Sequence, residues 1–220
     1  MKKVGIFIPG RLESQRLPNK LILPLGETNL WDIACKKLET LSDKYNVYVL
    51  CHDEELINIA SKYKLTIIKR APETTTIEGP FKEIFKDLKD VKDDYLMFLN
   101  PCLYNLKVST IEKAIEYFIE SEYSSMTSVK EFKNWLYRKD GHYLLETDVN
   151  KDNWSTKEVY NYYEAAHCFH VCTKTMLFED NKMLDDFHDC FIIDKEETLD
   201  IDTKQDYDYA RWRFENEARD

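Results

Sequence analysis

Short apolar runs alternate along the first half of the chain with longer segments whose apolar residues recur every three or four positions. Runs rich in β-branched and aromatic residues, bounded by turn residues, are typical of buried strands. They occupy residues 4–8, 45–51, 65–68 and 94–99. Helical spacing of apolar residues predicts amphipathic helices between and after these runs. They are expected at 30–41, 52–62, 81–88 and 108–123. The alternation predicts βαβ units and an α/β fold with a mainly parallel sheet and helices on both faces.

The second half of the chain is less regular. Residues 125–129 and 162–172 are expected to form strands, and a final helix is expected to begin at Thr203. Between the two strands, residues 131–161 show poor periodicity. Large aromatic side chains stand there among charged ones: Trp135, Tyr137, Tyr143 and Trp154. Aromatic residues in polar surroundings fit a subunit interface, and they also fit a β-meander lying on the sheet. The pattern leaves both interpretations open.

Length and composition fit one α/β domain over residues 1–220, with room for an inserted subdomain at about 131–161. The chain contains no apolar run of about 18 residues, so no transmembrane helix is expected. The apolar run at residues 4–8 is too short for a signal peptide. The six cysteines are scattered and form no CxxC pair. This indicates reduced thiols in a cytoplasmic protein rather than a disulfide framework.

The formal net charge of −10 disfavours a general nucleic-acid-binding protein, which needs a basic surface. It does not exclude a small anionic substrate, because local cations and a metal ion can outweigh the global field. Local clusters of charge therefore carry the functional argument.

One such cluster is a basic loop directly after the first strand. Pro9 and Gly10 end the strand and allow a tight turn. The loop then presents three cations and a hydroxyl, those of Arg11, Arg16, Lys20 and Ser14. In open α/β sheets ligands sit beyond the carboxyl ends of the strands, where loop N–H groups also donate to phosphate oxygens. The loop predicts a triphosphate site, and a solvated basic loop is the alternative.

A second cluster closes the chain. Asp200 and Asp202 alternate on a segment expected to be extended, so both carboxylates are expected to face one way. Two like charges held close together repel, and a divalent cation relieves that repulsion. Thr203 and Asp206 form a near capping box for the final helix. The pair predicts a Mg²⁺ site, and a strand edge with solvated acids is the alternative.

The order of residues in the basic loop, Arg11-x-x-Ser14-x-Arg16-Leu17-Pro18-x-Lys20, resembles a known motif. It is the ARxxSxRxPxK motif of the cytidylyltransferases that activate acidic sugars, the CMP-sialic acid and CMP-KDO synthetases. Gly10 stands where that motif has alanine. Residues 24–30 are similar to the family's L-x-G-x-P-L turn, with Asn29 in place of proline. Residues 199–206 are similar to its I-D-I-D-T-x-x-D segment, whose two aspartates hold Mg²⁺.

The resemblance extends to three further strand ends. Residues 49–53 resemble a V-x-T/S-D segment, and residues 69–73 resemble an R-P-x-E turn. These resemblances assign Asp53 and Arg70 to nucleotide binding. The alternatives are that Asp53 caps a helix and that Arg70 is a surface cation. Asn100 stands where the sialate branch has Q-P-T-S-P and is expected to take the hydrogen-bonding role of that glutamine. The absence of an aspartate there brings the chain closer to the sialate branch than to the KDO branch.

The strand at 162–172 resembles the family's R-x-N-G-A-x-Y segment, which faces the acceptor. The arginine that would meet a sugar carboxylate is absent. Tyr162, Glu164 and His167 are the candidate acceptor-binding residues in its place. His167 also begins a run of possible metal ligands with Cys168, His170 and Cys172. Alternation along a strand is expected to place the last three on one face. No second pair completes a zinc site, so a metal is not expected there.

The resemblance implies a Rossmann-like fold of the nucleotide-diphospho-sugar transferase type and a CTP-dependent cytidylyltransferase that releases pyrophosphate. It assigns Arg11, Lys20, Asp200 and Asp202 to catalysis, with Mg²⁺ as cofactor, and Pro9, Gly10, Ser14 and Arg16 to the nucleotide. The partners expected are CTP, a small anionic acceptor and a second copy bound through residues 131–161, with neither nucleic acid nor membrane. Two alternatives remain open. One is a glycosyltransferase, because Asp200-Ile201-Asp202 matches a D-x-D metal motif, and the other is a non-catalytic relative.

Overall fold

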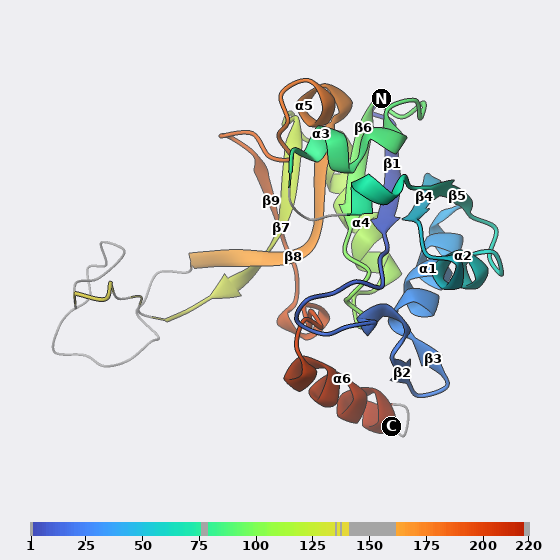
Figure 1. The fold of residues 1–220 in the computed structure, drawn as a ribbon. Coiled ribbons are helices and arrows are strands. Elements are labelled where there is room, and N and C mark those ends of the chain that lie inside the picture. The colour runs from blue at the N-terminus through green and yellow to red at the C-terminus, as the bar shows by residue number, and fades with distance from the viewer. Residues whose placement is uncertain (1, 76–78, 135, 137, 141–161, 218–220) are drawn as a thin grey trace, which may run out of the picture.

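The computed structural model describes residues 2–75, 79–134, 136, 138–140 and 162–217. Seven of the described strands form one twisted sheet (Figure 1). In spatial order they are β5 (Thr66–Lys69), β4 (Asn46–Cys51), β1 (Val4–Pro9), β6 (Tyr95–Leu99), β8 (Tyr162–Thr173), β7 (Ser125–Phe132) and β9 (Asp189–Ile192). The first four are parallel, β8 runs antiparallel to both its neighbours, and β9 is parallel to β7. The predicted mainly parallel α/β sheet is confirmed.

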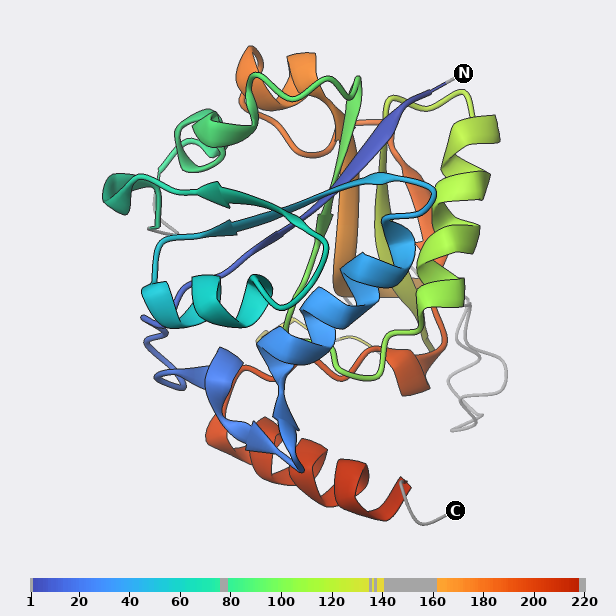
Figure 2. The same cartoon turned by 90° about the vertical axis from the view of Figure 1, so that its right-hand side faces the viewer.

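Helices cover both faces of this sheet, as predicted. One face packs against α1 (Leu30–Leu41), α2 (Glu54–Ala60) and α4 (Val108–Glu120), which lie together in Figure 2. The other face is covered by α3 (Phe81–Ile84), the 3-10 turn η3 (Lys86–Leu88) and α5 (Lys174–Phe178). Trp31 and Phe118 are fully buried on the first side, and Phe7 on the second. Each such side chain contributes about 1.5–3 kcal/mol by burial, so both faces of the sheet carry a core.

The remaining elements surround the carboxyl ends of the parallel strands. They are η1 (Lys20–Ile22), the hairpin of β2 (Pro24–Leu25) and β3 (Thr28–Asn29), η2 (Pro72–Thr75), η5 (Lys195–Glu197) and α6 (Lys204–Glu217). The α6 helix packs on the hairpin, where the Tyr207 hydroxyl donates to the Pro24 carbonyl at 2.5 Å. This contact brings the end of the chain to the basic loop (Figure 1).

The helices and strands predicted from periodicity are present in the structure, one of them broken in two, and several short elements were not predicted. The predicted helix at 81–88 breaks at Phe85, whose φ of −111° and ψ of 17° separate α3 from η3. Neither α5 nor β9 was predicted. Both are short, and the side chains of β9 alternate between half-buried and exposed. Elements of four or five residues carry too few apolar positions to show a period.

The face predicted for Cys168 is wrong, because β8 contains a bulge. The pairing of β7 with β8 shifts between Thr127 and Val129, and His167 has a φ of 53°. The Ser128 hydroxyl fills the bulge by accepting from the backbone N–H groups of Cys168 at 2.9 Å and Phe169 at 3.2 Å. Such a bulge reverses the faces of the residues beyond it. Cys168 accordingly packs on the α1 side of the sheet, and Cys172 packs on the opposite side.

Most of the predicted insertion at 131–161 lies outside the described residues, including Trp135, Tyr137, Tyr143 and Trp154. The described part ends in the long arms of β7 and β8, which extend away from the sheet in Figure 1. Among the described helices, none combines the length and apolar character needed to cross a membrane.

Candidate active site

A cavity of about 430 Å³ opens beyond the carboxyl ends of β1 and β6, where ligands of open α/β sheets are held. Seven of the eight residues predicted to bind nucleotide line it. They are Pro9, Gly10, Arg11, Ser14, Arg16, Lys20 and Arg70. The basic loop after β1 therefore shares this cavity with Arg70, a cation that follows β5.

Backbone and side-chain hydrogen bonds fix the shape of the basic loop. The Gly10 N–H donates to the Leu50 carbonyl at 2.7 Å, which continues the pairing of β1 with β4. The Asp53 carboxylate accepts from the Leu12 N–H at 3.2 Å and makes no capping hydrogen bond to α2. Asp53 does not line the cavity. Its carboxylate reaches the site through the backbone of the basic loop and makes no capping hydrogen bond, so Asp53 positions the predicted nucleotide-binding loop.

Trp31 explains why glycine follows Pro9. Helix α1 places the Trp31 ring against Gly10. The indole N–H of Trp31 donates to the Leu56 carbonyl at 3.0 Å. A Cβ atom at residue 10 would lie inside the van der Waals radius of the ring. The alanine of the motif therefore has no space in this chain, because α1 carries tryptophan at the facing position.

Gly10→Ala is expected to destabilise the folded protein by about 1–3 kcal/mol, the usual cost of overpacking a buried contact. A fully buried indole that is held by a hydrogen bond cannot move aside easily. Urea unfolding of the single variants and of Gly10→Ala with Trp31→Leu checks the cause. Trp31→Leu should make Gly10→Ala less costly. Equal costs of Gly10→Ala in both backgrounds would contradict the proposed contact.

Arg70 is buried, so the alternative of a surface cation is wrong. Only 4% of the residue is exposed, and its guanidinium donates to the Ile84 carbonyl at 3.1 Å and to the Thr74 hydroxyl at 3.3 Å. Burial lowers the pKa of Arg70, and the nearby Asp87 opposes that shift. An arginine nonetheless stays charged in proteins. The site thus holds a fixed cation at its inner end.

An apolar wall beside Arg70 was missed by the sequence analysis. Phe81, Ile84, Phe85 and Phe98 line the same cavity as the basic loop. Phe85 packs edge-on to Phe7 at 5.1 Å between ring centroids. The spacing of Phe81 and Phe85 on one predicted helix was the available signal. The cavity therefore combines a cationic mouth with an aromatic interior, which suits a ligand with a charged chain and a planar ring.

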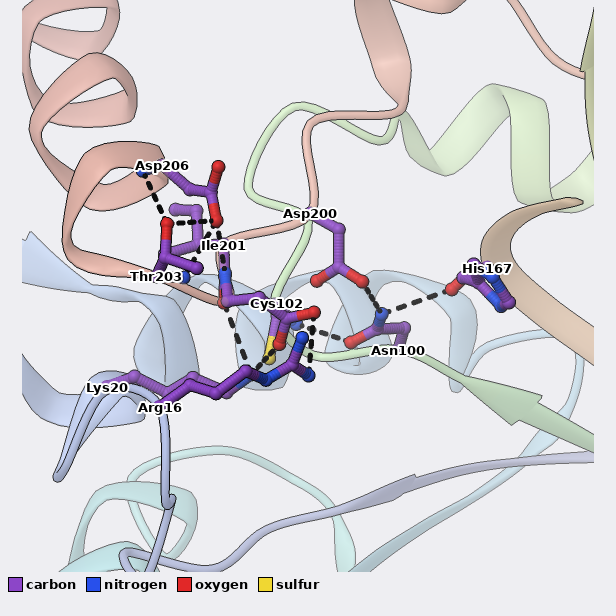
Figure 3. Close-up of polar contacts among 10 residues, drawn as sticks. Arg16, Lys20, Asn100, Cys102, His167, Asp200, Ile201, Thr203 and Asp206 are labelled. Atoms are coloured by element: carbon purple, nitrogen blue, oxygen red, sulfur yellow. Dashed lines mark hydrogen bonds and ion pairs between the residues drawn. The ribbon is translucent and has the colours of Figure 1, made fainter. Parts of the chain in front are cut away.

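Arg16 and Lys20 of the basic loop contact one carboxylate of the C-terminal segment directly, and Asn100 holds Asp200 beside it (Figure 3). The Lys20 ammonium lies 2.8 Å from one oxygen of Asp202, and the Arg16 guanidinium lies 2.9 Å from the other. Lys20 also donates to the Ile201 carbonyl at 3.2 Å. Burial lowers the pKa of Lys20, but Cys102 and Asp202 raise it more, so the net shift of that pKa is upward. Lys20 therefore remains an ammonium throughout the neutral range.

Asp200 lies beside this pair and is held by Asn100. The Asn100 amide donates to one Asp200 oxygen at 3.1 Å and to the His167 carbonyl at 3.1 Å, and its oxygen accepts from the Cys102 N–H at 2.9 Å. The other Asp200 oxygen is buried and has no hydrogen-bond partner among the described residues. Burial raises the pKa of Asp200, and the charge of Asp202 raises it further. The two carboxylates are therefore close enough to interact.

The segment carrying both carboxylates belongs to no strand, so the alternative of a strand edge is wrong. Its Ile201 N–H donates to the Cys102 carbonyl at 3.3 Å. The predicted capping box is confirmed, since Asp206 accepts from the N–H of Thr203 at 2.7 Å and from that of Asp202 at 3.2 Å. The start of α6 thereby fixes the backbone of Asp202.

Asp200 and Asp202 also have the chemistry of a magnesium site. Mg²⁺ takes oxygen ligands and is usually bound by one or two protein carboxylates together with substrate phosphates. An unpartnered carboxylate oxygen beside a second carboxylate matches that requirement. Among the described residues, no group of three or more metal-binding side chains surrounds them. Oxygens of a phosphate substrate would complete the coordination of a cation held here.

The structure brings only part of the predicted acceptor strand to this site. The His167 backbone contacts Asn100, and Asn100 contacts Asp200. Glu164 lies farther along the arm of β8, where it pairs with Lys130 of β7 at 3.4 Å. Tyr162 pairs with Phe132 at the end of that arm. Glu164 lines a separate cavity between the arm and η5, together with Lys133, Lys195 and Arg213.

Comparison with known proteins places the whole chain in one group. A family model described as cytidylyltransferase matches residues 5–214. The 3-deoxy-manno-octulosonate cytidylyltransferase of Rickettsia felis is 30% identical over 127 residues, which are 57% of this chain and 51% of that protein. The N-acylneuraminate cytidylyltransferase of Streptococcus agalactiae is 22% identical over 215 residues, which are 94% of this chain and 52% of that protein. The chain spans about half the length of these curated relatives.

The fold agrees with that match. A solved CMP:2-keto-3-deoxy-manno-octonic acid synthetase in complex with CTP superposes with a TM-score of 0.74 at 12% identity, over 98% of this chain and 100% of the other. The likeness at this identity concerns the fold alone. The family model, in contrast, runs from β1 to α6 and so includes the basic loop and both aspartates. The chain belongs to the cytidylyltransferase family.

Proposed function

We propose that this protein transfers a cytidylyl group from CTP to a small acceptor. An acceptor hydroxyl oxygen attacks the α-phosphorus, the bond from that phosphorus to the bridging oxygen breaks, and pyrophosphate leaves while the hydroxyl proton goes to solvent. The observation that carries the proposal is the direct contact between the basic loop and the carboxylates, Lys20 to Asp202. A site for nucleotidyl transfer needs cations for a triphosphate next to acids for a metal.

The residues divide by what they can reach. Arg11, Arg16 and Lys20 at the mouth of the cavity would bind the triphosphate, and Arg70 with the aromatic wall would take the nucleoside. Asp200 and Asp202 would hold Mg²⁺, which when bound neutralises charge on the phosphate oxygens. Asn100 would orient Asp200 and the acceptor side of the site. Positioning and electrostatics supply the rate enhancement in such a reaction.

The glycosyltransferase alternative rested on the D-x-D pattern of residues 200–202 alone. That motif normally follows the nucleotide-binding half of a glycosyltransferase, whereas here it precedes the final helix. The family match over residues 5–214 favours cytidylyl transfer.

We propose that ordinary sialic acid is a poor acceptor. A bidentate arginine–carboxylate pair is among the stronger polar contacts available, and the acceptor strand has no arginine. Glu164 is nearly half exposed in its pair with Lys130 and leaves negative charge on that strand. The preferred acceptor would meet His167 with its anion, or would be long enough to offer a donor such as an amine to Glu164 in the separate cavity that Glu164 lines.

The assay is pyrophosphate release with each nucleoside triphosphate and Mg²⁺, over sialic acid, amino-bearing and phosphonate acceptors. We expect turnover with CTP, with sialic acid at least about tenfold slower than the best acceptor, the cost of losing about 1.4 kcal/mol. Glu164→Gln should reduce that difference in rate only for acceptors long enough to reach the cavity that Glu164 lines. Turnover of sialic acid as fast as any other acceptor would show that the missing arginine is replaced from elsewhere. If none of the nucleoside triphosphates gave pyrophosphate with any acceptor, the proposed activity would be refuted.

We also propose that the protein acts as a homodimer through the aromatic-rich residues 131–161. The support is their composition and the exposed aromatic ring of Tyr163 at the base of the insertion, which is 49% exposed. Light scattering at micromolar concentration should give about twice the chain mass. A single species of 26.3 kDa would count against the dimer.

A cytoplasmic location is proposed on the state of the thiols. Every cysteine is free, and Cys190 alone among them is exposed. Reduced, unpaired cysteines fit a compartment that keeps thiols reduced.

A further inference from the structure

Asp202 is paired with two of the cations that would bind the triphosphate. Both of its oxygens are occupied, one by the Lys20 ammonium at 2.8 Å and the other by the Arg16 guanidinium at 2.9 Å. A carboxylate engaged in this way offers little to a cation. Conversely, cations engaged in this way offer less to a phosphate. The basic loop and the carboxylate segment therefore occupy each other's ligand-binding groups.

Lys20 carries most of this contact. Its side chain is 17% exposed and that of Asp202 is 27% exposed, so water screens their attraction only in part. The Arg16 side chain is 66% exposed, and ion pairs of that kind are worth little. The backbone of Asp202 is fixed by Asp206, and Lys20 is anchored on the Ile201 carbonyl. The pair is thus held by the fold rather than formed by two mobile side chains.

The hydrogen-bonding capacity of Lys20 makes the contact competitive. An ammonium has three N–H groups. Two of those on Lys20 are taken by Ile201 and Asp202, and the Cys102 thiol is a hydrogen-bond partner as well. A triphosphate oxygen that engages Lys20 therefore competes with partners already present, and Asp202 is the only charged one among them. The triphosphate also brings negative charge close to Asp202, and that repulsion favours a cation between them.

We propose that the Lys20–Asp202 pair is a latch that couples the two ligands. The triphosphate competes with Asp202 for Lys20 and Arg16, and its binding releases Asp202 to the metal. Nucleotide and Mg²⁺ consequently bind with positive cooperativity, and by linkage each strengthens the other equally. This inference rests on the proposed function, because it takes the ligand of the basic loop to be a triphosphate.

The first test measures binding of metal-free CTP by calorimetry in EDTA. Asp202→Asn keeps an oxygen that can accept from Lys20 but removes the charge that competes with phosphate. It should bind CTP about three- to tenfold more tightly than the unmodified protein, the range expected for losing one partly exposed ion pair. Asp208→Asn is the matched control. It removes the same charge from the start of α6, where Asp208 pairs with Lys204, and should leave the affinity unchanged.

The second test uses the metal alone and does not depend on the stability of Asp202→Asn. Lys20→Gln removes the ammonium from one oxygen of Asp202 and leaves only the exposed Arg16 on the other, so Mg²⁺ without nucleotide should raise its melting temperature more than that of the unmodified protein. Lys36→Gln, an exposed lysine on α1, controls for the loss of one positive charge. No extra stabilisation of Lys20→Gln by Mg²⁺ would overturn the latch.

The outcomes separate the latch from the function beneath it. Equal affinity of metal-free CTP for the unmodified protein and Asp202→Asn overturns the latch and leaves cytidylyl transfer standing. Equal tightening by Asp202→Asn and Asp208→Asn overturns it too, because bulk charge then explains the effect. Binding of CTP to none of these proteins, with or without Mg²⁺, refutes the proposed function itself.

Discussion

Lys20→Ala is expected to lower kcat/KM for CTP by about 100- to 1,000-fold, the usual cost of removing one preorganised charge from a transition state. Lys20 lines the cavity and contacts Asp202, so it stands between the proposed triphosphate and metal sites. The fold should survive, because losing a partly exposed ion pair costs about 1 kcal/mol at most. Steady-state kinetics at saturating acceptor, with the melting temperature as a check on folding, measures both.

Arg11→Ala should behave similarly, since Arg11 lines the same cavity and donates to the Thr75 carbonyl at 3.1 Å. Lys36→Ala is the control. It removes an exposed lysine from α1, outside the cavity, and should leave kcat/KM unchanged. Normal kinetics in both Lys20→Ala and Arg11→Ala would sink the assignment of the basic loop to the donor nucleotide.

Asp200→Asn is expected to abolish most turnover while leaving the protein as stable as before, or more so. Its loss of charge removes a proposed metal ligand, which should lower kcat by at least about 100-fold. The same carboxylate is costly to the fold, because burial and the charge of Asp202 raise its pKa. Activity and stability therefore oppose each other at this residue, as is common where a site needs buried charge.

The pH dependence of stability is a second test of the destabilising charge on Asp200. An acid whose pKa is higher in the folded state binds its proton more tightly there, so its charge destabilises the fold above that pKa. The destabilisation disappears as the pH falls through the folded pKa. Asp200→Asn should therefore exceed the unmodified protein in stability at neutral pH, and the difference should shrink on acidification. Wild-type kcat in Asp200→Asn at saturating Mg²⁺ would remove Asp200 from the site.

Local periodicity was enough to predict the framework of the fold. The strands β1, β4, β5 and β6 each lie within a compact run rich in apolar residues, and α1 has the bounds predicted for it, Leu30–Leu41. Such patterns are readable because burial of one face sets the spacing of apolar residues. The bulge in β8 was not readable. The bulge depends on the Ser128 hydroxyl of β7, which accepts from the backbone of β8. The residue pattern within β8 contains no information about that partner.

The sequence by itself determined the chemistry at the two ends of the site. The basic loop and the carboxylate segment each carry their charges within a few residues, so local order was sufficient to identify them. Only the tertiary structure decided how they meet. Lys20 reaches Asp202 across 182 positions of sequence, Asn100 joins Asp200 to His167, and Trp31 determines which residue fits at position 10. These contacts depend on where the sheet places distant strand ends and on the packing of α1, which residue spacing along the chain does not encode.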